Sequence, residues 1–271
     1  MSFKSIRDYF DSNELHVETP RRCNNCLNCT DCSFQGQQLS LREQYEYEIM
    51  SKNVTFDEEN HVFRVKYPFL QDPSILTNNF NQVTKIATRE EKNLCKEGLM
   101  EEFNKEFNNM IQYGALVELS KDCMTAWKGP VHYISLQHIL KPESPTTPIR
   151  IVSNSSLSDR NGNSLNSILM KGPNALSDQR DVVSRWRTYE SALSTDLTKA
   201  YFAMKTGELE LHVRRVVWRY GKTQEDWKHF GYATVSFGDK PAGVFLEIVI
   251  NQAADKFQKI DPQAANKMVL T

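Results

Sequence analysis

The order of apolar and polar positions divides the chain into helical and extended segments. The stretch "LSLREQYEYEIMSKN" is predicted to be a short helix capped by Ser40, because Glu43 follows three residues later as in a capping box. Across residues 81–113, apolar side chains recur about every 3.6 residues, which predicts a longer helical region. Gly98 is expected to divide this region, and Gly114 to end it in the left-handed conformation.

Alternating patterns elsewhere predict strands. A short strand is expected at Val62, and a long β-hairpin where "GPVHYISLQHIL" and "IRIVSNSS" flank the turn-rich "PESPTTP". Two more strands are expected at "HVRRVVWRY" and "YATVSF". Helices are expected at "LSDQRDVVSRWRTYE", capped by Ser177, and at "GDKPAGVFLEIVINQAADKF", where Pro241 suits the first turn. Helices and strands follow one another without an internal repeat, which indicates the α+β fold class.

Composition and charge narrow the possible partners only slightly. The chain has 271 residues, is 39% hydrophobic and carries a formal net charge of −1, so it has no general attraction for nucleic acid. Residues 178–222 contain nine Lys or Arg and six Asp or Glu, a surplus that either forms a solvated face or contacts phosphates. No apolar run reaches the roughly 18 residues of a membrane span. The N-terminal residues also lack the apolar core of a signal peptide. We therefore expect an intracellular location and no membrane partner. The cytoplasm is favoured, and the nucleus is the alternative.

Cysteines cluster near the N-terminus. Four of the six are spaced three residues apart: Cys23, Cys26, Cys29 and Cys32. In a reducing compartment such a cluster indicates a metal rather than disulfides, and four thiolates suit Zn²⁺. A flexible thiol-rich linker is the alternative, because ligands so close in sequence must bend the chain sharply. Iron–sulfur binding is disfavoured because the spacing departs from the ferredoxin pattern. Cys95 and Cys123 are isolated and are expected to be semi-buried thiols.

Several blocks are specific when taken together and in order. They are "GPVHYISLQHIL", "TPIRIVSNSS", "SLNSILMKGPNAL", "ALSTDLTKAYFAMK", "RRVVWRY" and "TVSFGDKPAG". In order and spacing they resemble the reverse transcriptase of Bel-Pao LTR retrotransposons. The stretch "PRRCNNCLNCTDCSF", followed by "LSLREQ", resembles the segment between protease and polymerase in those polyproteins.

The resemblance implies three parts along the chain. Residues 1–39 would form a Cys-rich linker that is a candidate for zinc binding, and residues 40–115 a helical connecting region. Residues 116–271 would form the fingers and first half of the palm of a right-hand polymerase. The implied activity is RNA-directed DNA synthesis by two-magnesium nucleotidyl transfer. The implied partners are an RNA or DNA template-primer, dNTPs and the remainder of the Pol polyprotein.

Asp196 is the central residue of this resemblance. It occupies the position of the first catalytic carboxylate, at the end of a palm strand, where it would bind Mg²⁺ together with the backbone carbonyl of Leu197. Hard cations such as Mg²⁺ prefer oxygen ligands of this kind. In the implied mechanism, two magnesium ions activate the primer hydroxyl and stabilise the departing pyrophosphate. On its chemistry alone, Asp196 could instead cap the turn that follows. The two roles are compatible.

Two basic residues are implied to contact the triphosphate. Arg150 matches a fingers arginine, whose guanidinium offers paired donors to phosphate oxygens. Lys141, at the tip of the predicted hairpin, would be a second phosphate contact. Each could instead be an ordinary exposed cation.

Three further residues are implied to contact the sugar and base. Tyr201 would lie under the incoming sugar and exclude a ribose 2′-hydroxyl, unless it packs in the core and Phe202 takes its role. Phe237 would flank the base, and Gly238 would let the backbone approach the nucleotide. As a bare pattern, "SFGDKPAG" is only a strand–turn–helix junction.

The sequence departs from the family pattern in two ways. Asn154 stands near a position where the family often has Asp, a change of local charge that removes no metal ligand. More importantly, no Asp-Asp pair occurs, whereas the polymerase needs a second carboxylate pair on a Tyr-x-Asp-Asp hairpin. We therefore expect a fragment truncated before that motif and inactive as given. The alternative is a non-catalytic nucleic-acid- or zinc-binding remnant, degenerate or domesticated.

Overall fold

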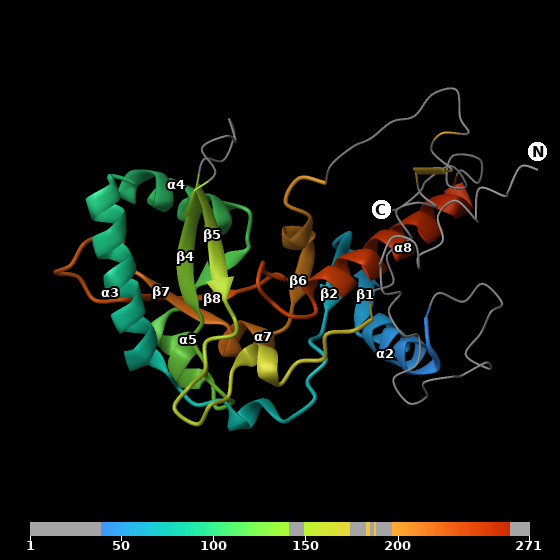
Figure 1. Ribbon diagram of the computed structural model, residues 1–271, viewed down its shortest axis with the longest axis horizontal. Coiled ribbons are helices and arrows are strands. Elements are labelled where there is room, and N and C mark those ends of the chain that lie inside the picture. The colour runs from blue at the N-terminus through green and yellow to red at the C-terminus, as the bar shows by residue number, and fades with distance from the viewer. Residues whose placement is uncertain (1–38, 141–148, 174–182, 185–186, 188–196, 261–271) are drawn as a thin grey trace, which may run out of the picture.

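The computed structural model describes residues 39–140, 149–173, 183–184, 187 and 197–260, which form a mixed α+β structure with three small sheets (Figure 1). The α-helices are α2 (Leu41–Lys52), α3 (Phe80–Glu97), α4 (Met100–Gln112), α5 (Lys121–Ala126), α7 (Glu208–Val213) and α8 (Ala242–Ile260). The short 3₁₀ helices are η1 (Pro73–Ile75), η2 (Leu165–Ser167) and η3 (Ala200–Ala203). In this part of the chain, none of the helices combines the length and apolarity that crossing a membrane requires.

Eight strands in the described residues make up the sheets. They are β1 (Val54–Asp57), β2 (Val62–Val65), β3 (Leu116–Glu118), β4 (Ser135–Leu140), β5 (Ile149–Asn154), β6 (Met204–Thr206), β7 (Arg215–Trp218) and β8 (Lys228–Tyr232). The sheet orders are β1-β2-β6, β3-β8-β7 and β4-β5. The last of these is the predicted hairpin, with Ser135 opposite Asn154 and Ile139 opposite Arg150.

The structure confirms the predicted N-terminal helices. Ser40 caps α2, because its hydroxyl accepts the N–H of Glu43 while the Glu43 carboxylate accepts the N–H of Ser40 at 2.8 Å. Gly98 separates α3 from α4 with φ of 72°, and Gly114 follows α4 with φ of 65°. Both glycines hold the left-handed conformation that ends a helix without steric penalty.

Two predicted strands differ from the observed ones. The strand expected at "HVRRVVWRY" begins only at Arg215, because the residues before it form α7. The strand expected at "YATVSF" does not form as a continuous strand: β8 ends at Tyr232, and Thr234 makes only an isolated bridge to Lys205 of β6. The segment after Tyr232 bonds to β6 instead: the N–H of Thr206 donates to the carbonyl of Ala233 at 2.9 Å, and the N–H of Val235 donates to the carbonyl of Met204 at 3.0 Å. The guanidinium of Arg214 binds the same segment, donating to the carbonyls of Tyr232 at 3.1 Å and Thr234 at 2.7 Å.

Two main apolar clusters hold these elements together. The first joins α2 and α8 to the β1-β2-β6 sheet. The second lies between α4, the β4-β5 hairpin and the β3-β8-β7 sheet, and is rich in aromatic rings such as Phe107, whose ring meets that of Phe230 edge-on at 5.0 Å. Figure 1 shows α3 along the outer side of the hairpin and α8 at the opposite end of the molecule. The loop before α8 therefore has to connect the two clusters.

Candidate functional site

The loop before α8 is fixed to the end of β5. The hydroxyl of Ser153 donates to the carbonyl of Phe237. Gly238 has φ of 105°, and a Cβ atom placed on it would lie 2.2 Å from the carbonyl oxygen of Ser153. Only glycine tolerates both this conformation and this approach. The residue predicted to let the backbone approach a nucleotide therefore also lets two segments of the chain approach each other.

A buried carboxylate anchors the same loop. The Asp239 side chain is 0% exposed and forms an ion pair with Arg214 at 3.0 Å. Ser155 and Ser236 donate hydroxyl hydrogen bonds to it at 2.5 Å and 2.9 Å, and the hydroxyl of Tyr67 donates a further one. Burial raises the pKa of Tyr67 well above its ordinary value, so that it stays a neutral donor. A buried charge persists only when partners compensate it in this way.

Arg214 extends this network across the fold. Besides Asp239 and the two carbonyls at and just after the end of β8, its guanidinium donates to the hydroxyl of Thr206, at the end of β6, at 2.6 Å. The first sheet, the end of β8 and the loop before α8 therefore share one buried cation. Neither Arg214 nor Asp239 stands in a local sequence pattern that predicts long-range pairing, so their contact could not be foreseen from the sequence.

Two residues predicted to contact a nucleotide meet beside this loop. The rings of Tyr201 and Phe237 lie 4.7 Å apart at 83°, an edge-on aromatic contact. Phe237 is 50% exposed, whereas Tyr201 is half-buried and its pKa is raised by burial. Phe202 belongs to the second apolar cluster and lies near Tyr113 instead. Of the two aromatic candidates in η3, it is therefore Tyr201 that joins Phe237.

The segment before Tyr201 lies at the surface. Leu197 is 56% exposed. Lys199 has φ of 56°, and its ammonium nitrogen lies 3.6 Å from the centre of the Tyr113 ring, a cation–π contact that sequence analysis did not anticipate. Asp196 itself lies outside the described residues, so its predicted roles as a magnesium ligand and as a cap stay predictions.

The other predicted residues fall into two groups. Arg150 is exposed on β5, on the strand whose other end holds the Phe237 loop, and Asn154 is the last residue of that strand. Lys141, Cys23, Cys26, Cys29 and Cys32 lie outside the described residues, as does most of the helix expected after Ser177. Among the residues that are described, no three His, Cys, Asp or Glu side chains are arranged to hold a metal ion. The zinc and magnesium sites therefore stay predictions.

Two expectations about surface chemistry need correction. The arginines of "RRVVWR" do not face solvent phosphates: Arg214 and Arg215 are buried, and Arg219 pairs with Glu91 at 2.8 Å. Cys95 is exposed rather than semi-buried, whereas Cys123 is partly buried as expected.

Comparison of the sequence with models of known protein families gives no match, and a search of curated proteins also finds none.

Proposed function

We propose that this chain forms the fingers and the first half of the palm of a retrotransposon RNA-directed DNA polymerase of the Bel-Pao type. One observation carries the proposal beyond the resemblance of sequence blocks. Tyr201 and Phe237, from separate segments, form one aromatic contact beside Gly238, on a loop fixed to the strand that bears Arg150. Two of the residues assigned to one nucleotide by resemblance are thus in direct contact, and a third lies on the strand that holds their loop.

The proposed role of each residue follows from the chemistry of its side chain. The exposed ring of Phe237 offers a stacking surface for a base, and the ring of Tyr201 stands against it where an added 2′-hydroxyl would collide. Arg150 offers paired donors for phosphate oxygens. Asp196 and the carbonyl of Leu197 would hold Mg²⁺, which when bound supplies positive charge to the triphosphate. Asp239 and Arg214 act as positioning residues, since they hold the Phe237 loop in place.

The proposal can be tested by ternary-complex binding. A fluorescent primer annealed to an RNA template is titrated with the 271-residue chain, in Mg²⁺ and with either the complementary dNTP or its ribonucleotide. The dNTP should tighten the complex more than the ribonucleotide does. Tyr201→Ala should reduce that preference by about tenfold or more, because the group that excludes the 2′-hydroxyl is gone.

Tyr45→Ala is the matched control, because Tyr45 is 65% exposed on α2 and has no part in the proposed site. It should keep the wild-type preference. Equal tightening by both nucleotides in the wild-type chain, or an unchanged preference in Tyr201→Ala, would contradict the proposed nucleotide site.

The catalytic part of the proposal needs a longer polypeptide that includes a Tyr-x-Asp-Asp hairpin. Such a polypeptide should extend the primer with Mg²⁺, and Asp196→Asn should abolish extension, because the substitution removes a charged metal ligand. The 271-residue chain alone should not extend it. If the Asp196→Asn form kept its rate, Asp196 would not be the catalytic carboxylate.

A further inference from the structure

The charges of α3 are sorted onto opposite sides of the helix. Lys85, Arg89, Lys92 and Lys96 follow one another at intervals of four, three and four residues, which places them along one side of an α-helix. We call this set the basic face. All four residues are exposed, and within the described residues none has an ion-pair or hydrogen-bond partner.

The acidic residues of α3 point elsewhere and are already engaged. Glu90 lies 2.7 Å from Nδ1 of His138 and also accepts the backbone N–H of that residue at 2.8 Å. Glu97 lies 2.9 Å from Nε2 of the same imidazole. Glu91 is bound to Arg219. None of these carboxylates is therefore free to neutralise the basic face.

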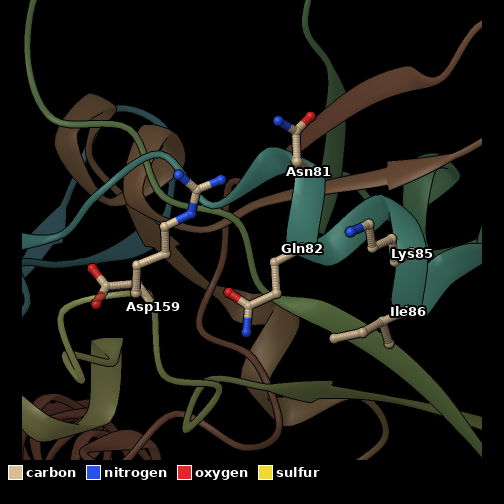
Figure 2. A pocket seen from close by; sticks show the side chains of 6 residues that line it. Asn81, Gln82, Lys85, Ile86 and Asp159 are labelled. Carbon is tan, nitrogen blue, oxygen red and sulfur yellow. The ribbon is translucent and has the colours of Figure 1, made fainter.

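A pocket lies at the N-terminal end of the basic face (Figure 2). It has a volume of about 460 Å³ and lies between the start of α3 and the loop that follows β5. Its lining residues are Asn81, Gln82, Lys85, Ile86, Asp159 and Arg160. Lys85 belongs to both the pocket and the basic face. Arg160, which is also exposed, adds a second cation from the opposite wall.

The single carboxylate of the pocket is occupied by its own surroundings. Asp159 accepts hydrogen bonds from the N–H and the hydroxyl of Thr77, both at 2.8 Å. It also accepts the backbone N–H groups of Asn161 at 2.9 Å and Asn163 at 3.0 Å. Four donors thus saturate this carboxylate, while Lys85 and Arg160 lack protein partners among the described residues. An anionic ligand would supply the missing partner.

We propose that the basic face and the pocket bind one strand of nucleic acid. The basic face spans twelve residues, and the eleven helical steps from Lys85 to Lys96 cover roughly 16 Å, which matches about five phosphates of a stacked strand. The pocket is larger than a single phosphate requires. The Asn81 amide can bond a base edge, as can the amide oxygen of Gln82, whose nitrogen already donates to the carbonyl of Ser158 at 3.0 Å. Ile86 gives an apolar contact.

An anionic membrane is the other polyanion that such a face could meet. Peripheral membrane helices bury large apolar side chains beside their basic residues. The exposed residues of α3 include no large apolar side chain. Nucleic acid is therefore the occupant that the face favours.

Binding of a labelled single-stranded RNA dodecamer to the full chain, followed by fluorescence anisotropy, tests this proposal. The variant combines four substitutions: Lys85→Gln, Arg89→Gln, Lys92→Gln and Arg160→Gln. It should bind at least about tenfold more weakly at low salt. The slope of log K against log salt should also fall by about 3, since each phosphate contact on a single strand contributes roughly 0.7.

The control removes the same number of charges from other elements. It combines Lys52→Gln, Lys66→Gln, Lys105→Gln and Lys121→Gln, all at exposed positions. It should keep the wild-type affinity and slope. Equal weakening in both variants would mean that only net charge matters, and would overturn the proposed site. So would unchanged binding in the first variant.

Two further experiments distinguish a nucleic-acid strand from a free nucleotide and from an anionic membrane. Uridine monophosphate, added at the same phosphate concentration as unlabelled dodecamer, should displace the labelled RNA poorly. Equal displacement would overturn binding of a strand in favour of a free nucleotide. Vesicles of phosphatidylcholine and phosphatidylserine in a 4:1 ratio should not sediment the chain. Sedimentation that the first variant abolishes, without RNA binding, would replace the proposal with a membrane site.

Discussion

Two parts of the chain are rich in basic residues, and the structure uses them in opposite ways. In the segment from the end of α7 to the residue after β7, Arg214 and Arg215 are buried, and Arg219 pairs with Glu91 at 2.8 Å. On α3 the cations lie on the outer side and have no partners among the described residues. The first set holds the fold together, whereas the second is available to a ligand. A surplus of positive charge in sequence therefore says little until the position of the opposite charges is known.

The contrast has a geometric origin. Arg214 sits at the junction of α7 and β7, where its guanidinium reaches carbonyls and hydroxyls of three surrounding segments. Helix α3 is 18 residues long and packs one side against the hairpin and β7. Its acids gather on that side, where they meet His138 and Arg219, and its bases remain on the other.

Removal of the buried cation should have the largest effect. Arg214→Ala leaves the carboxylate of Asp239 buried without its ion-pair partner, and we expect a loss of about 3–5 kcal/mol in the free energy of unfolding. Urea denaturation followed by circular dichroism measures this loss directly. If Arg214→Ala does not fold, a second variant still tests whether the charges of Arg214 and Asp239 stabilise each other.

That comparison is the double variant Arg214→Ala with Asp239→Asn. It removes both charges together, so it should be more stable than Arg214→Ala alone. A loss below about 1 kcal/mol for Arg214→Ala, or no gain from the second substitution, would show that the pair is not coupled as its geometry indicates.

The inner side of α3 gives a smaller, pH-dependent effect. Burial lowers the pKa of His138, but hydrogen bonds to Glu90 and Glu97 outweigh it, so the pKa is raised above 6.5. The charged form is therefore favoured in the folded state. Its stabilising contribution is complete below the unfolded pKa and is lost as the pH rises through the raised folded value.

His138→Gln should consequently cost about 1–2 kcal/mol near pH 5.5, and the cost should shrink by pH 8.5. Urea denaturation of both proteins across this range gives the difference directly. Other histidines titrate in both proteins and cancel in the comparison. A difference that stays constant with pH would mean that the imidazole contributes through packing rather than charge.

The parts of the fold that follow local periodicity could be predicted from sequence. Helices α3 and α4 and the β4-β5 hairpin appear as expected, because apolar spacing, glycine caps and turn residues act over short distances. The end of β8 was misplaced, because the residues after Tyr232 leave β7 and bond to β6, where the N–H of Val235 donates to the carbonyl of Met204. No pattern near Tyr232 signals that long-range contact.

The candidate site shows the same division. The resemblance selected Tyr201 and Phe237 together, and their rings are in contact. Asp239 stood inside a recognised block without any sign that it would be buried against Arg214. The spacing of the basic face is visible in sequence at helical period. A charge count along a linear window does not separate one face of a helix from the other, so it does not reveal this surface.

The outer side of α3 should give the smallest change in stability, and of opposite sign. Lys85 with Arg89, and Lys92 with Lys96, are like charges four residues apart, and such pairs destabilise a helix by roughly 0.2–0.5 kcal/mol each. Replacing all four with Gln should therefore raise the free energy of unfolding by about 0.5–1 kcal/mol at low salt. The gain should fade as salt screens the repulsion. The four-lysine control variant, with its charges on separate elements, should change by less. If the four substitutions lowered the free energy of unfolding, the basic face would stabilise the fold, as Arg214 does. If they raise it while they weaken RNA binding, the role of the basic face is to bind its ligand.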